Sequence, residues 1–235
     1  MSHSIRQQLI EARRFDIHVC AKQIAALVAK RIWSFKGKVV ESTYSYDGDH
    51  IELFYDKEFE TLGERLEGEF FNYFPETEIE IKVKPGEIND VDGYYYHTLS
   101  EDQDGLIEIS VSLRDDYHNR IRESSLEHAM YCVIVHEMQH VVQRCHANIQ
   151  MAQIHKSPVD HLNDYREIDA RTEEILCDVP DESDQVVFES KLRSYLKDYC
   201  NRNIKWSIDV EKIVENHMKF YSEKILGYLH QSTYV

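Results

Sequence analysis

Apolar and polar residues follow two different periods along the chain, and the period changes several times. Apolar side chains recur at helical spacing through residues 4–33, which predicts a long N-terminal helix. Residues 39–46 and 51–55 are short apolar and aromatic stretches on either side of a glycine turn, and each is typical of a strand. Residues 59–70 return to helical spacing, so a helix is predicted there.

Strict alternation marks the next part of the chain. Residues 78–84 alternate between apolar side chains and Glu or Lys, which predicts a strand with one buried and one solvated face. Residues 94–99 and 106–113 predict a hairpin around the turn at Asp104-Gly105. In the second arm of this hairpin, the apolar residues all share one face, so this arm is expected to contact the core.

The rest of the chain is predicted to be mainly helical. An apolar run at residues 131–142 indicates a buried helix, and another helix is expected to start near Asp164. The segment between them, residues 157–163, is interpreted as a loop that lets the two helices pack antiparallel. Two further helices are expected at about residues 184–200 and 208–229.

The turn after Pro180, which carries several acidic residues, is the best candidate for a boundary. It divides the chain into an α+β domain over residues 1–180 and a helical extension over residues 181–235 that packs on the same domain. The predicted fold class is therefore α+β, with a small mixed sheet, a long N-terminal helix and helices at the C-terminal end.

Composition narrows the function classes. The 235 residues include 43 Asp and Glu against 27 Lys and Arg, which gives a formal net charge of −16. General nucleic-acid binding and attachment to anionic membranes are disfavoured because both need a basic surface, whereas basic substrates or partners suit an acidic one. No stretch is long and apolar enough for a transmembrane span, and the polar N-terminus is unlike a signal peptide. The five cysteines include no C-x-x-C pair and are interpreted as reduced thiols of a cytoplasmic protein.

The candidate chemistry lies in the apolar run, which contains His136-Glu137-Met138-Gln139-His140. Four residues along a helix correspond to about 400° of rotation and about 6 Å of rise, so the two imidazoles lie on one face. Two neutral nitrogen ligands at this spacing can share one zinc ion. Glu137 stands beside them, where its carboxylate can take a proton from a metal-bound water. The motif therefore predicts a zinc hydrolase, most simply a peptidase, with one Zn²⁺ per chain.

A catalytic zinc needs a third protein ligand, and Glu167 is the leading candidate. If its segment is helical, the small residue Ala170 faces the same side and lets the helix approach the metal helix closely. Glu167 also lies three residues after Asp164, a plausible N-cap, so its carboxylate could instead close a capping box.

Other residues stay open as the third ligand. Asp169 lies about 200° around the helix from Glu167, so both cannot face one metal. His146 stands where metzincins have their third histidine, but Gln143 replaces the glycine that breaks the helix in that pattern. If the helix continues, His146 lies roughly 80° from His136 and misses the metal. Two more histidines remain possible ligands, namely His155 and His161.

With these residues the chain resembles the zincin metallopeptidases, particularly the gluzincin branch, which joins a His-Glu-x-x-His helix to a later Glu-x-x-Ala segment. The resemblance covers roughly residues 94–176. It implies a zincin-like sheet in which residues 106–113 form the edge strand that binds extended substrate. Many gluzincins have an Asp four residues after the ligand Glu, where this chain has Arg171, so Asp169 or a backbone carbonyl is expected to orient the histidines.

The resemblance implies hydrolysis of a peptide or protein substrate, with Glu137 as general base. The implied zinc ligands are His136, His140 and Glu167, and the candidate oxyanion donors are Tyr165, His161 and the tyrosines at 94–96. The alternative is a zinc-binding but non-catalytic zincin-like module that binds a partner or has a regulatory role. The presence of Glu137 favours the enzyme, because a binding module has no need of it. A third possibility is a chance motif in a helical structural protein.

Overall fold

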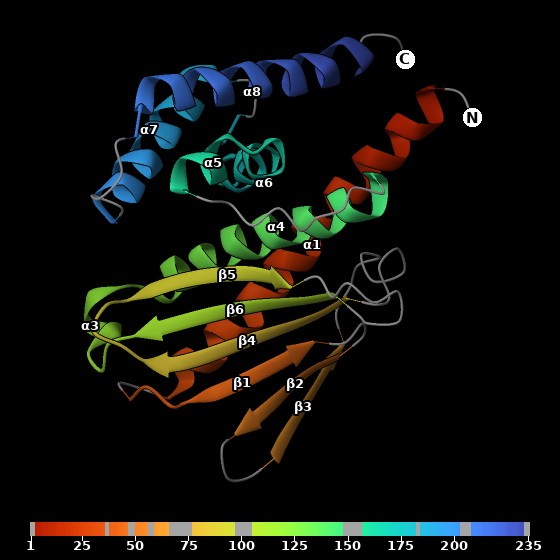
Figure 1. The fold of residues 1–235 in the computed structure, drawn as a ribbon. Helices are drawn as coiled ribbons and strands as arrows, with labels where there is room; N and C mark the ends of the chain where they lie inside the picture. The colour runs from red at the N-terminus through yellow and green to blue at the C-terminus, as the bar shows by residue number, and fades with distance from the viewer. Residues whose placement is uncertain are drawn as a thin grey trace. The chain divides into compact units, whose positions relative to one another are not determined.

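The computed structural model describes residues 3–35, 38–46, 50–55, 59–65, 77–96, 105–147, 157–181, 184–202 and 208–232. The chain divides into two compact units, Met1–His146 and Ala147–Val235. The described part of the first unit holds a sheet and helices, and that of the second holds helices alone (Figure 1). The fold class is therefore mixed α+β, as predicted.

The described strands of the first unit form one six-stranded sheet in the order β3-β2-β1-β4-β6-β5. Strands β4 and β6 pair in parallel, and every other neighbouring pair is antiparallel. The strands are β1 (Ser42–Tyr46), β2 (His50–Tyr55), β3 (Phe59–Arg65), β4 (Thr77–Pro85), β5 (Asp90–Tyr96) and β6 (Gly105–Leu113). The predicted strands at 78–84 and 106–113 and the antiparallel pairing of the two hairpin arms are confirmed.

The two faces of the sheet centre follow the alternation in the sequence. Ile79 pairs with Ile107 and Ile81 with Ile109, and all four side chains are buried. On the opposite face, the ammonium of Lys82 lies 2.8 Å from a carboxylate oxygen of Glu80 and 2.5 Å from one of Glu108. The apolar face is therefore the core side of the sheet, and burial of each of its large aliphatic side chains stabilises the fold by about 1.5–3 kcal/mol.

Two long helices accompany the sheet in the first unit. The helices of this unit are α1 (His3–Ser34), α3 (Tyr117–Arg120) and α4 (Glu123–Ala147). Tyr117 ties α3, the short helix just before α4, to the end of α1, because its hydroxyl donates to the Ile32 carbonyl at 2.9 Å and its ring packs edge-on against Trp33. Further along, Nδ1 of His18 in α1 lies 2.7 Å from the hydroxyl of Tyr131 in α4. These contacts fix α4, which carries the His-Glu-x-x-His motif.

The second unit is a small helical assembly with its own core. Its helices are α5 (Pro158–Asn163), α6 (Tyr165–Leu176), α7 (Gln185–Arg202) and α8 (Val210–Ser232). Phe188 of α7 stacks on Tyr221 of α8 at 4.0 Å between ring centroids, and the Asn216 amide donates to the Asn163 side chain at 2.8 Å. Within the described residues, no helix combines the length and apolar composition that a membrane crossing requires.

The structure differs from the sequence predictions in two elements. Residues 59–65, predicted as part of a helix, form strand β3. This strand pairs with β2, with Phe59 opposite Phe54 at one end and Arg65 opposite His50 at the other. The spacing of Phe59 and Leu62 suits a helix, but pairing with β2 overrides a weak helix preference that Gly63 lowers further. Residues 66–70 lie outside the described residues. The expected loop at 157–163 contains the short helix α5, capped by the Ser157 side chain, which accepts from the amide of Asp160.

The division of the chain also differs from the expected boundary near residue 180. Leu162, Ile175 and Val179 share one hydrophobic core with Phe188 and Ile213, so α5 and α6 belong with the C-terminal helices. The acidic turn after Pro180 is therefore a connection inside the second unit, and the division falls after His146 instead. An acidic turn in a sequence does not reveal which helices share a core.

Candidate metal centre

The two motif histidines lie side by side on α4. Their Nε2 atoms are 3.2 Å apart and their rings are nearly perpendicular, at 80°. Both side chains are buried, with 5% of His136 and 8% of His140 exposed. The i,i+4 spacing places them on one helix face, as the sequence predicts.

This separation suits a shared zinc ion. Two nitrogens that bind one tetrahedral zinc at about 2.05 Å each lie about 3.3 Å apart. The observed Nε2–Nε2 separation between His136 and His140 is 3.2 Å. It is also the separation of an N–H···N hydrogen bond, so the pair can pass from one arrangement to the other without a change in the helix. The donor type and the spacing of the two imidazoles therefore fit a divalent zinc.

Gln143 orients the second histidine. Its Oε1 lies 3.1 Å from Nδ1 of His140, so Nδ1–H donates to the amide oxygen and the lone pair of Nε2 points towards His136. Such an outer partner fixes the tautomer and the ring angle of a metal-binding histidine. From the sequence, Asp169 or a backbone carbonyl is the expected partner, whereas in the structure Gln143 lies beside His140. The available signal was its i,i+3 spacing from His140, which brings the two side chains together on a helix.

Glu137 is buried and lies against the backbone of strand β5. A methyl group at Gly93 would lie 2.9 Å from Cγ and 3.0 Å from Oε1 of Glu137, and 2.6 Å from Cγ1 of Val133. Contacts this short show that the strand passes directly over the Glu137 side chain. Glycine is therefore needed at position 93, because any larger residue would displace Glu137 or Val133.

The two edge strands of the described sheet are β3 and β5, whereas β6 lies between β4 and β5. The expectation that residues 106–113 form the edge strand is therefore wrong. The alternating pattern predicts which face of a strand is buried but does not say which neighbour it pairs with, and here the parallel pairing with β4 covers β6 on its second side. The edge strand next to Glu137 is β5, which carries Gly93.

Asp92 and Tyr94 stand on either side of Gly93 in the edge strand. The carboxylate of Asp92 accepts from the Gly93 amide at 3.0 Å and from the Tyr94 hydroxyl at 3.3 Å. The negative charge of Asp92 and partial burial raise the pKa of Tyr94, and Glu137 adds to the increase. Tyr94 is therefore a neutral phenol at ordinary pH.

Glu167 lies in the second unit, in the first turn of α6. Asp164 caps this helix, because its carboxylate accepts from the Arg166 amide at 2.9 Å. In a capping box, the Glu167 carboxylate would accept from the amide of Asp164. That amide donates to the His161 carbonyl instead. An Oε2 atom of Glu167 lies 3.4 Å from Nε2 of His161. Ala170 is fully buried.

The other candidate ligands have different settings. Asp169 accepts from the ammonium of Lys224 at 2.7 Å, and Glu173 pairs with the same ammonium, so Asp169 belongs to a buried charge cluster inside the second unit. Helix α4 continues unbroken to Ala147, so the backbone of His146 stays on the helix as expected. The side chain of His146 and the whole of His155 lie outside the described residues.

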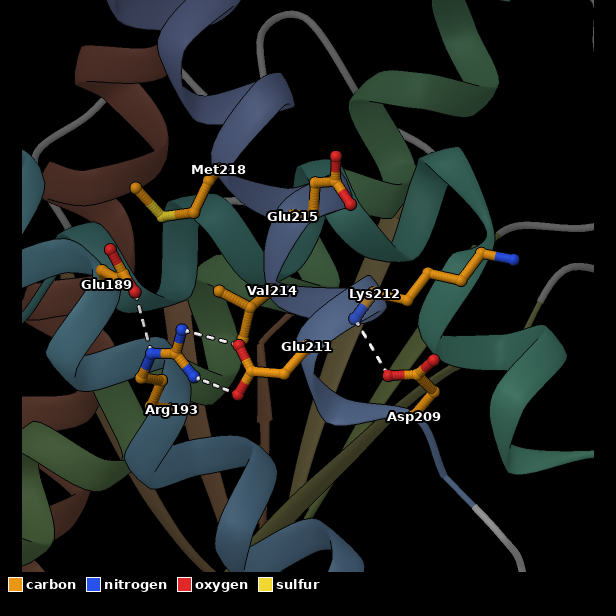
Figure 2. A pocket seen from close by; sticks show the side chains of 8 residues that line it. All are labelled: Glu189, Arg193, Asp209, Glu211, Lys212, Val214, Glu215 and Met218. Carbon is orange, nitrogen blue, oxygen red and sulfur yellow. Dashed lines mark hydrogen bonds and ion pairs between the residues drawn. The ribbon is translucent and has the colours of Figure 1, made fainter.

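A shallow cavity of about 680 Å³ lies between α7 and the start of α8 in the second unit (Figure 2). Three of its charged groups pair with one another, as the guanidinium of Arg193 contacts carboxylates of Glu189 and Glu211 at 2.8 Å each. These ion pairs are solvent-exposed, and each contributes little to stability. The cavity holds no histidine, cysteine or hydroxyl nucleophile, and we assign no chemistry to it.

No family model, curated protein or solved structure matches this chain. A functional assignment must therefore come from the chemistry of the residues themselves. The first unit supplies two buried imidazoles, an orienting amide and a buried carboxylate, and the second supplies a further carboxylate beside a histidine.

Proposed function

We propose that the protein is a zinc-dependent metallopeptidase of the gluzincin-like zincin type. The observation that carries the proposal is the 3.2 Å separation of two buried imidazole nitrogens, His136 and His140, on the helix turn that also holds Glu137. A divalent cation offsets the cost of burying such groups together. The zincin-like arrangement is supported by the edge strand β5, which runs beside the motif helix.

The proposed ligands of one Zn²⁺ per chain are His136, His140 and Glu167, the last contributed by the second unit. When bound, zinc supplies Lewis acidity that lowers the pKa of water towards neutrality and polarises a carbonyl. Gln143 holds His140 in the tautomer whose Nε2 lone pair is available. His161, 3.4 Å from the Glu167 carboxylate, steadies that group. The choice of Glu167 rests on its donor type and on the buried Ala170 beside it.

Glu137 is the proposed general base. Its carboxylate accepts a proton from the attacking water and then delivers the proton to the leaving amine. The Gly93 backbone beside it limits the positions that the carboxylate can take, so the base is held ready for transfer. Burial of Glu137 keeps bulk water away from the proton.

The proposed substrate is an extended peptide or protein segment that pairs by β-augmentation with β5, on the side where the described residues form no neighbouring strand. Gly93 in the middle of this strand places the paired peptide next to Glu137. The net charge of −16 favours basic peptides.

The experiment compares Glu137→Gln with Glu127→Gln, a second glutamate of the same helix. Each zinc-loaded protein is incubated with a peptide library, and the products are identified by mass spectrometry. We expect Glu137→Gln to keep its zinc and lose cleavage by about 10²-fold or more, while Glu127→Gln cleaves as the wild type does. Cleavage that survives in Glu137→Gln contradicts the proposal. Zinc binding without cleavage of any peptide in the wild type favours the non-catalytic module instead.

A further inference from the structure

Helix α4 carries a second pair of metal-binding side chains, His128 and Cys132, outside the site described above. Nε2 of His128 lies 3.5 Å from Sγ of Cys132. The pair has the same i,i+4 spacing as His136 and His140, so both side chains lie on one face of the helix. Cys132 is partly buried and forms no disulfide, and His128 is exposed to solvent.

The separation and donor types match those of a zinc ligand pair. Imidazole nitrogen binds zinc at about 2.05 Å and thiolate sulfur at about 2.3 Å, so the two atoms on a tetrahedral ion lie about 3.6 Å apart. The observed separation between His128 and Cys132 is 3.5 Å. Nitrogen and sulfur donors together favour Zn²⁺ and its spectroscopic substitute Co²⁺ over hard ions such as Mg²⁺.

We propose that His128 and Cys132 bind a second divalent zinc ion, with water completing its coordination. Binding forms one metal–nitrogen and one metal–sulfur bond, and the thiol proton passes to the buffer without any change of oxidation state. The centres of the two pairs are eight residues apart on α4, which corresponds to about 12 Å along the helix axis. Two-metal catalytic sites have their ions about 3.5–4 Å apart, so this is a separate mononuclear site.

The surroundings make this site weaker and more exchangeable than the one at His136 and His140. The ring of Tyr131 lies 6.1 Å from that of His128, and its hydroxyl is 2.7 Å from Nδ1 of His18. His18 is therefore engaged by Tyr131, and the neighbouring ring buttresses the His128 imidazole. With two protein ligands from α4 and open access to water, the ion can enter and leave readily.

Cobalt distinguishes the two sites because only one of them contains sulfur. A thiolate bound to Co²⁺ gives a charge-transfer absorption in the near ultraviolet, which a site of two histidines and a glutamate cannot give. Apo-protein is titrated with Co²⁺ as wild type, Cys132→Ser, His128→Ala and Cys200→Ser. Cys200, a partly buried cysteine of α7, is the matched control.

We expect the sulfur band in the wild type and in Cys200→Ser, and its loss in Cys132→Ser. In His128→Ala the cobalt affinity of this site should fall roughly tenfold or more. Loss of a group that only orients a ligand already lowers metal affinity by about 10- to 100-fold, and His128 is a ligand itself. A wild type without the band, or a band that persists in Cys132→Ser, overturns the proposal. The cobalt–thiolate band does not depend on the site at His136 and His140, so it is also expected in Glu167→Ala. Failure of this proposal is therefore distinguishable from failure of the proposed function.

Discussion

Replacing Gly93 by alanine tests the contact between the edge strand and Glu137. The added methyl would lie 2.6 Å from Cγ1 of Val133 and 2.9 Å from Cγ of Glu137. Ordinary carbon–carbon contacts are about 3.5–4.0 Å, so the methyl is too close by about 1 Å and something must move. Overpacking of this kind costs about 1–3 kcal/mol of stability. A displacement of about 1 Å at a catalytic group costs about 10²-fold in rate.

Gly105→Ala is the matched control, because a methyl there would lie 2.8 Å from the Tyr95 hydroxyl and 2.9 Å from its ring, in the same sheet. Both variants are measured by urea unfolding, by zinc content and by cleavage of a peptide from the library. We expect similar losses of stability, unchanged zinc content, and a loss of kcat in Gly93→Ala alone. Equal cleavage rates in the two variants would refute the argument that Gly93 positions Glu137.

Three further predictions concern stability and metal affinity. Burial lowers the pKa of His217 to about 4, so as the pH falls below about 6.5 the unfolded chain takes up a proton before the folded one does. The free energy of unfolding should therefore drop by about 3 kcal/mol between pH 6.5 and 4. In urea titrations, His217→Gln should remove this contribution to the pH dependence of stability. Gln143→Leu should weaken zinc binding by about 10- to 100-fold in a chelator competition, because His140 loses its acceptor, and an unchanged affinity would rule out this role. Lys224→Met leaves two buried carboxylates of α6 without their cation and should cost about 3–5 kcal/mol. Lys191→Met breaks an exposed pair and should cost less than about 1 kcal/mol, so equal costs would contradict the burial argument.

The sequence predicted those features that depend on local periodicity. The alternation at residues 78–84 and 106–113 predicted both strands and their buried faces, and the helical spacing at 4–33 predicted α1. The N-cap at Asp164 was also predictable, since an aspartate before a helical stretch has a side chain that accepts from the first amides. The pairing of His136 with His140 followed from helix geometry alone.

Features set by contacts between distant segments could not be predicted in this way. Strand β3 formed where the spacing favoured a helix, because β2 offered backbone partners. The edge position of β5 depends on the parallel pairing of β4 with β6, which no local pattern encodes. The close passage of Gly93 over Glu137 is likewise a property of the assembled sheet. The contact of Gln143 with His140 is a local feature, because residues three apart on a helix lie side by side.

The most direct test of the central proposal is the content of tightly held zinc, measured by elemental analysis after dialysis. The Cys132→Ser background removes the second site, so that only the site at His136 and His140 contributes. We predict about one zinc per chain in this background, and a sharp fall when Glu167→Ala is added. A Cys132→Ser protein that binds no zinc, even after the metal is added back, would contradict the account.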